Sequence, residues 1–338
     1  MNEVKLKKML VRSFKVGFGT CVAIFIETTL GMEYAASAGT ITLLTILTTK
    51  WETLRLSLYR IITFVISVAV AGILFEHINQ QWLAFGLFVF IIAFICELFG
   101  WRAALSVNAV IGTHFLISRV FSREAIINEF CLVIIGSAGA VILNLFNGNR
   151  SHKKRIVQNM RDTERDLQIV LKELAQYLDN REMKRDVWED LKLLEENLEH
   201  YTDEAYIYQG NTFHSHPGYY IDYFKMRTWQ CHMLQNLHSE LQRIREMPVQ
   251  AKIVSEYMFY MADFVTEANV PEKQIQALSR IFARMQLQPL PTSREEFESR
   301  ATLYHILMDL EDFLLFKKQF VESLSEVQKQ KYWEKKIG

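Results

Sequence analysis

Apolar residues in the first 150 positions gather into six stretches, near 14–30, 35–49, 57–75, 82–99, 103–118 and 126–146. A helix needs about 20 apolar residues to cross the hydrocarbon of a bilayer. The third, fourth and sixth stretches have that length, the second and fifth are short, and Lys15 and Glu27 interrupt the first. One apolar N-terminal stretch is typical of a signal peptide, whereas six in series predict an integral membrane domain.

Later in the chain, apolar residues recur every three or four positions, as in Leu167, Val170, Leu171, Leu174 and Leu178. This period is typical of amphipathic helices, and no strand-like alternation is sustained. We therefore predict an all-α protein with two domains. The first is a six-helix transmembrane domain over residues 1–150, and the second is a cytoplasmic antiparallel helical bundle over residues 151–338.

Charge changes at the same boundary. Residues 1–150 hold 12 Lys and Arg, 8 Glu and no Asp, while residues 151–338 hold 26 Lys and Arg against 30 Asp and Glu. The second domain is net acidic, which argues against nucleic acid as a partner.

Sequence motifs for common chemistries are missing. There is no Walker A, GxSxG, HExxH or dinucleotide-binding glycine pattern, so we expect neither an enzyme nor a cofactor. The four cysteines show no CxxC spacing, and His214 and His216 lack an acidic or cysteine partner at ligand spacing. No metal site is predicted.

Basic residues favour one side of the predicted membrane domain. They precede the first span, lie between the second and third (Arg60 is counted here), and follow the fourth and sixth. Only Arg119 and Arg123 lie on the other side. Because Lys and Arg are enriched in cytoplasmic loops, we predict that the N-terminus and the second domain are both cytoplasmic.

The segment LGMEYAASAG, residues 30–39, combines two glycines and several small residues with a glutamate. One interpretation is a break after which the second helix points its N–H groups and positive dipole end at an anion. The other is a tight hairpin whose small residues allow close helix packing. On the first interpretation the candidate substrate-binding residues are Gly31, Glu33, Ala36, Ser37 and Gly39.

A similar pattern follows the fourth span. An ungapped alignment of residues 31–40 with 100–109 places Glu33 opposite Arg102 and has three identities: Gly31 with Gly100, Ala35 with Ala104, and Ser37 with Ser106. Such identities among small residues are also common by chance in membrane spans. A true repeat would relate two three-span halves in inverted orientation, as around the binding sites of many transporters.

Charged residues inside membrane spans are costly and often functional. Glu27, Glu97 and His114 are candidate proton carriers. The alternatives are solvation at a span end for the glutamates and a helix–helix hydrogen bond for the histidine. Arg102 is a candidate for binding a substrate carboxylate, or simply a positive anchor at a cytoplasmic span end. Ser106, the counterpart of Ser37, completes the candidate set.

Three segments carry a resemblance to a known family: FKVGFGTCVAIFIE, LGMEYAASAGTITLLTILTTK and YYIDYFKMRTWQ. The first two resemble the opening of the aromatic acid exporter family of Gram-positive bacteria, and the third resembles the family's C-terminal domain. The resemblance covers essentially the whole chain and implies six spans with a helical cytoplasmic domain. It also implies a relation to fusaric-acid-resistance-like exporters, which expel aromatic carboxylic acids using the proton gradient. Those exporters carry two six-span units, so a homo-oligomer is one hypothesis for the second.

Together these observations predict a multi-pass protein of the bacterial cell (inner) membrane, surrounded by lipid, with proton-linked export of small aromatic carboxylic acids as its function. The alternative is a non-transporting membrane sensor or scaffold whose cytoplasmic bundle binds a partner protein. The aromatic run over 219–229 is interpreted either as a ligand pocket or, with more support from its helical spacing, as core.

Overall fold

The chain is helical in the computed structural model, which describes residues 3–46, 49–145, 150–213 and 218–333. These residues contain no strand, so the all-α prediction is confirmed. They divide into two compact units, which we call unit 1 (residues 1–148 with 210–212) and unit 2 (149–209 with 213–338). His214 and His216 lie outside the described residues.

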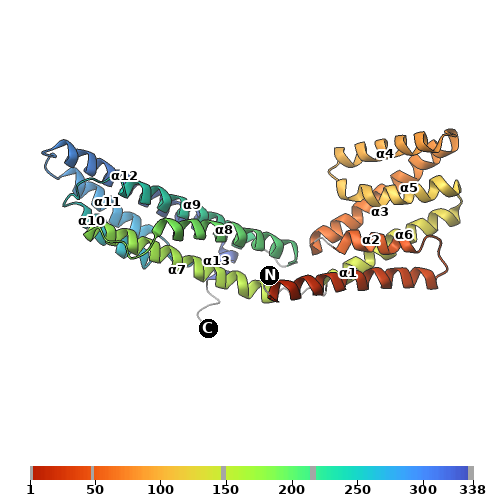
Figure 1. The fold of residues 1–338 in the computed structure, drawn as a ribbon, viewed down its shortest axis with the longest axis horizontal. Coiled ribbons are helices and arrows are strands. Elements are labelled where there is room, and N and C mark those ends of the chain that lie inside the picture. The colour runs from red at the N-terminus through yellow and green to blue at the C-terminus, as the bar shows by residue number, and fades with distance from the viewer. Residues whose placement is uncertain (1–2, 47–48, 146–149, 214–217, 334–338) are drawn as a thin grey trace. The chain divides into compact units, whose positions relative to one another are not determined.

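Unit 1 packs its helices side by side (Figure 1). The elements are α1 (Glu3–Thr29), α2 (Ala36–Ile46), α3 (Lys50–His77), α4 (Gln81–Leu98), the 3-10 helix η1 (Arg102–Ala104), α5 (Leu105–Ser118) and α6 (Arg123–Leu145). Thr49 begins α3 with a capping box, in which its side chain accepts from the Glu52 N–H and the Glu52 carboxylate accepts from the Thr49 N–H.

Four of these helices are long and apolar enough to cross a membrane: α1, α3, α4 and α6. The 11 residues of α2 and the 14 residues of α5 are not. At about 1.5 Å per residue they extend roughly 17 and 21 Å, against a hydrocarbon core of about 30 Å. Because α2 and α5 are too short to cross this thickness, the six-span prediction is not confirmed. Both helices begin after a break in the backbone.

Large apolar side chains cover the outer surface of unit 1. Among them, Phe14, Trp82, Phe90 and Ile117 are each more than two thirds exposed. On a water-soluble protein, a surface with this many exposed apolar side chains would mark an interaction site. Along helices of spanning length, the surface that fits them is lipid.

Inside unit 1, small residues let the helices approach closely. A Cβ on Gly136 of α6 would lie 2.7 Å from the Ile41 Cβ of α2, and a Cβ on Gly39 of α2 would lie 2.7 Å from Ile24 of α1. Such contacts are typical of membrane helices, whose association depends on packing rather than on the hydrophobic effect. The short α2 is thus held between α1 and α6.

Unit 2 is a bundle of helices (Figure 1). They are α7 (Arg150–Asn180), α8 (Val187–Gly210), α9 (Gly218–Leu241), α10 (Ala251–Ala262), α11 (Glu272–Gln286), α12 (Arg294–Ser323) and α13 (Glu326–Tyr332). Its core contains the predicted stripe on α7, in which Leu167, Leu171 and Leu174 are fully buried.

The aromatic run at the start of α9 belongs to this core. Tyr219, Tyr223 and Phe224 are fully buried, and Tyr220 is nearly so. The Tyr219 hydroxyl donates to Glu267 Oε1 at 2.7 Å and the Tyr223 hydroxyl donates to Glu164 Oε1 at 3.0 Å. Buried hydroxyls need such partners, so these rings are structural.

Candidate functional site

The break after α1 is a glycine-capped helix end. Gly31 has φ +66°, its N–H donates to the Thr28 carbonyl at 3.1 Å, and the Met32 N–H donates to the Glu27 carbonyl at 3.1 Å. These two bonds, with a left-handed glycine between them, define a Schellman motif. Glycine is favoured here because an L side chain is strained at positive φ.

The break after α4 has the same geometry. Gly100 has φ +71°, its N–H donates to the Glu97 carbonyl at 3.2 Å, and the Trp101 N–H donates to the Cys96 carbonyl at 2.7 Å. The residue matched by this motif to Glu27 is therefore Cys96, and Glu97 is matched to Thr28.

That offset of one residue separates the two candidate glutamates. Successive helix positions differ by about 100° around the axis. Glu27 and Cys96 both point inward and are 0% and 1% exposed, whereas Thr28 and Glu97 point outward. Glu97 instead forms an exposed ion pair, with Arg102 Nη2 at 2.5 Å from its Oε2.

Polar side chains from three helices meet beside the first break. His114 of α5 lies 2.8 Å from Glu129 Oε2 of α6 through its Nδ1, and 3.1 Å from Ser37 Oγ of α2 through its Nε2. The Tyr34 ring stacks on the imidazole, with centroids 4.0 Å apart and planes 7° apart. All three hydrogen-bonding residues are buried or half-buried.

Glu27 adds a second carboxyl group to this region. It is 0% exposed, and neither carboxyl oxygen has a hydrogen-bond partner among the described residues. Glu129 is 3% exposed and close enough to act on Glu27 through its charge. Buried polar groups are normally hydrogen-bonded, so a bare buried carboxyl requires an explanation.

The loop between α1 and α2 is pinned by a single side chain. The Glu33 N–H donates to Asn128 Oδ1 at 3.0 Å, and Asn128 Nδ2 donates to the Glu33 carbonyl at 3.1 Å. The Glu33 carboxylate itself is exposed. Tyr34 follows at φ +59°, an uncommon conformation for a non-glycine residue, and its backbone places the ring on His114.

The predicted site residues thus fall into two groups. Ser37 and His114 are in contact, and Glu27 is near enough to their neighbour Glu129 to interact with its charge. Gly31 and Glu33 lie in the adjoining loop, Ala36 is the first residue of α2, and Gly39 lies one turn on, packed against α1. The other group lies at the second break: Glu97, Arg102 and Ser106, all exposed.

Sequence reasoning missed two of the buried charged residues of unit 1, Glu129 and Arg60. Glu129 carries the same signal as Glu27, a lone carboxylate in an apolar stretch, and was open to prediction. Arg60 was counted as a loop residue, but α3 begins at Lys50, so Arg60 lies inside the helix and is 1% exposed. Its guanidinium donates to the Ile41 carbonyl at 3.4 Å and to the Thr45 hydroxyl, near the C-terminal end of α2, where the helix dipole favours a cation.

The fold and this interior define a multi-pass helical membrane protein. Comparison with known proteins gives the family. Residues 7–147 match the family model "Aromatic acid exporter family member 1", and residues 153–318 match "Putative aromatic acid exporter C-terminal domain". The chain belongs to the aromatic acid exporter family.

Two relatives show the extent of the likeness. The uncharacterized protein YqjA of Bacillus subtilis (strain 168) is 27% identical over 318 residues, covering 93% of this chain and 96% of YqjA. A crystal structure titled as a putative membrane protein from Clostridium difficile 630 is 27% identical and covers 50% of this chain and 98% of that one, with a TM-score of 0.46.

Proposed function

We propose that this protein exports small aromatic carboxylates, and that protons moving through unit 1 drive the export. Family membership supports a membrane transporter. The observation that carries the proton linkage is Glu27, a fully buried carboxyl group without a hydrogen-bond partner among the described residues.

A buried carboxyl without a partner is stable mainly in its neutral form, because an isolated charge is very costly to remove from water. When Glu27 releases its proton, its negative charge and that of Glu129 oppose each other. A buried carboxyl group without a hydrogen-bond partner is the kind of group expected to accept a proton on one side of a membrane and release it on the other.

His114 links the proton to the loop. Its ring bridges Glu129 and Ser37 and lies against Tyr34, so a change of protonation changes the hydrogen bonds at the start of α2. We propose that the aromatic acid binds at this loop. Its ring would either replace the Tyr34 ring or stack against it, and its carboxylate would lie near the first turn of α2.

The proposed substrate site accordingly consists of Gly31, Glu33, Ala36, Ser37 and Gly39 with Tyr34. Arg102 and Glu97 are left out because they are paired with each other at the second break, and Ser106 is left out because it lies in the helix that follows that break. Basic residues in the first half of α1 and after α6 support a cytoplasmic N-terminus and a cytoplasmic unit 2. The loop after α1 would then face outward.

The test is proton flux in liposomes, started by adding benzoate or 4-hydroxybenzoate to the reconstituted full-length protein. We expect Glu27→Gln and Glu129→Gln to abolish substrate-dependent flux. Glu97→Gln is the matched control, a glutamate one helix position away in the same capping motif, and it should retain the wild-type rate.

Equal flux in Glu27→Gln and wild type would overturn the assignment of the proton site. Flux that is absent from the wild type with every aromatic acid in a panel would overturn export itself. It would favour the alternative, a sensor or scaffold that transports nothing.

A further inference from the structure

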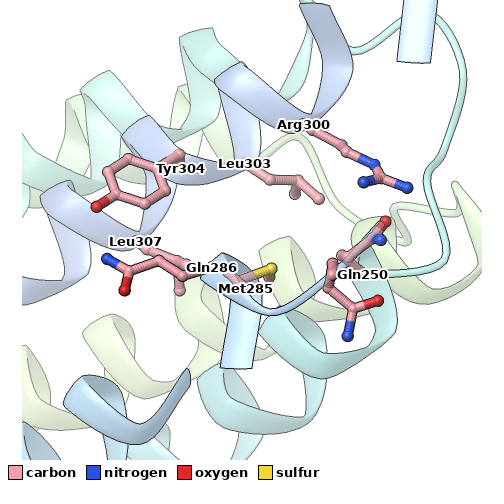
Figure 2. A pocket seen from close by; sticks show the side chains of 8 residues that line it. Gln250, Met285, Gln286, Arg300, Leu303, Tyr304 and Leu307 are labelled. Atoms are coloured by element: carbon pink, nitrogen blue, oxygen red, sulfur yellow. The ribbon is translucent and has the colours of Figure 1, made fainter. Parts of the chain in front are cut away.

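A cavity of about 140 Å³ lies in unit 2, between the C-terminal end of α11 and the middle of α12 (Figure 2). Gln250, at the start of α10, closes one side. The residues that line the cavity include Gln250, Met285, Arg300, Leu303, Tyr304 and Leu307.

The size of the cavity fits one aromatic ring. An apolar cavity of about 150 Å³ in a protein core is enough to bind benzene. Leu303 and Leu307 are buried and line the cavity with Met285, and Figure 2 shows the Tyr304 ring beside them. These side chains supply the apolar contacts that a flat hydrophobic ring requires.

The opposite side of the cavity is polar. Figure 2 shows the Arg300 guanidinium and the Gln250 amide at the same end of the pocket. Arg300 is held in position, since it donates to the Pro289 carbonyl at 2.6 Å and to Glu296 Oε1 at 2.5 Å. Its buried Nε has no hydrogen-bond partner among the described residues.

Gln250 provides an unused hydrogen-bond acceptor. It is 5% exposed, and its side-chain oxygen accepts no hydrogen bond among the described residues. Buried groups that make no hydrogen bond are costly, and a ligand that supplies the missing partner removes that cost. Two of the residues that line this ring-sized cavity therefore have unused hydrogen-bonding groups: Arg300 has a donor and Gln250 has an acceptor.

Charge at this site is balanced in the absence of a ligand. Glu296 offsets Arg300, and it also accepts from the Thr292 N–H at 2.7 Å and hydroxyl at 2.9 Å. These two bonds, followed by the Arg300 guanidinium, keep the pKa of the Glu296 carboxyl below its ordinary value. Because Thr292 occupies Glu296 Oε2, Arg300 retains donor capacity for a second anion.

We propose that this cavity binds a single-ring aromatic carboxylate bearing a hydroxyl group. The carboxylate accepts from Arg300 and the hydroxyl donates to Gln250, while the ring packs on Leu303, Leu307 and Met285. Unit 2 thereby senses the class of compound that unit 1 exports, an interpretation of the ligand's role that rests on the proposed function. The binding itself does not.

The test is calorimetric titration of the purified full-length protein in detergent with 4-hydroxybenzoate. Met285→Trp fills the cavity with a large side chain on a half-buried position, and we expect it to weaken binding at unit 2 by at least about tenfold. Leu287→Trp is the matched control: Leu287 lies two residues further on, is 87% exposed and does not line the cavity, so binding should be unchanged.

A second pair of variants tests the polar side. Arg300→Lys keeps the charge but removes the Nε–H donor and the planar fork, and should weaken 4-hydroxybenzoate more than benzyl alcohol, which has no carboxylate. Arg294→Gln on the same helix is the control, because Arg294 is an exposed partner of Glu298 away from the cavity. Wild-type affinity in both Met285→Trp and Arg300→Lys would overturn the proposal, as would a wild type that shows no saturable binding.

Failure of this proposal is distinguishable from failure of the proposed export. Glu27→Gln should lose proton flux and keep the unit 2 binding event. Met285→Trp should lose the binding event with the membrane site unaltered. If no aromatic acid is transported but binding persists and is sensitive to Met285→Trp, the cavity assignment stands without the exporter.

Discussion

Glu27 of unit 1 is buried in a different way from the charged residues of unit 2. In unit 2, Glu164 and Glu267 accept from Arg161 at 2.6 and 2.5 Å, Arg227 Nη2 lies 3.5 Å from Glu164, and the Lys317 ammonium donates to the Glu267 carbonyl at 2.5 Å. In unit 1, by contrast, Glu27 has no hydrogen-bond partner among the described residues.

The difference separates structural charges from functional candidates. A network in which charges satisfy one another fixes the geometry of a core, and its loss is felt as instability. A buried carboxyl group without a hydrogen-bond partner has no evident structural role. Ionisable groups in such surroundings are frequent at functional sites. Loss of the first kind should damage stability, and loss of the second should damage function.

The largest expected effect is on the network of unit 2. Glu164→Gln removes the negative charge that faces Arg161 and Arg227, and leaves a buried guanidinium without its counter-charge. We expect a loss of about 3–5 kcal/mol of stability in unit 2. Hydrogen exchange of the α9 backbone amides in the purified full-length protein reports this opening free energy.

Glu298→Gln is the control for that measurement. Its side chain is 46% exposed and paired with an arginine that is 85% exposed, and exposed pairs contribute about 0–1 kcal/mol. Similar losses in Glu298→Gln and Glu164→Gln would contradict the structural role of the network.

Lys317 should make the stability of unit 2 depend on pH. Burial, and then the charge of Arg227, lower the pKa of its ammonium group from 10.5 to about 7, while Glu164 and Glu267 raise it in part. Between these values the unfolded chain binds a proton that the folded chain does not, so stability rises with pH from about 7 toward 10.5. Below about 7 both states are protonated, and the full cost of burying the charge remains.

Lys317→Met tests this dependence, since methionine has a similar length and no charge. We expect it to remove the rise in unfolding midpoint between pH 7 and 9.5. Lys318→Met, at a half-exposed neighbour, should keep the wild-type slope. A slope that persists in Lys317→Met would assign the dependence to other groups.

Local features of the fold were predictable from the sequence. Ser293 precedes Glu296 by three residues, a spacing typical of a helix start, and its hydroxyl accepts from the Glu296 N–H at 3.0 Å as α12 begins. Gly31 and Gly100 were expected to interrupt helices, and both have positive φ. In each case the signal and its structural consequence lie within a few residues of each other.

The composition of the site was less predictable because it depends on tertiary contacts. The pairing of His114 with Glu129 requires α5 and α6 to be in register, which no local pattern encodes. The difference between Glu27 and Glu97 was accessible in principle. It follows from their distances to Gly31 and Gly100, four residues and three, once both breaks are known to share one capping motif.

The loop after α1 offers a smaller test of how the two breaks differ. Asn128→Ala removes both hydrogen bonds to Glu33, and at about 0.5–1.5 kcal/mol each we expect a loss of about 1–2 kcal/mol that is confined to this loop. Hydrogen exchange should accelerate over residues 31–37 and stay unchanged over residues 100–106. Equal acceleration at both breaks would indicate general loosening of unit 1 instead.

The smallest change in stability is expected at Glu27, where the change in function is largest. Glutamine has the size of a neutral glutamic acid, and no hydrogen bond to the carboxyl oxygens exists to be lost among the described residues. Glu27→Gln should therefore shift the unfolding midpoint of unit 1 by the equivalent of less than about 1 kcal/mol, while substrate-dependent proton flux disappears. Loss of stability comparable to that of Glu164→Gln would mean that Glu27 is a structural residue. Preserved stability with lost flux is the combination expected of a functional group, because the loss of a packing role would have changed both measurements together.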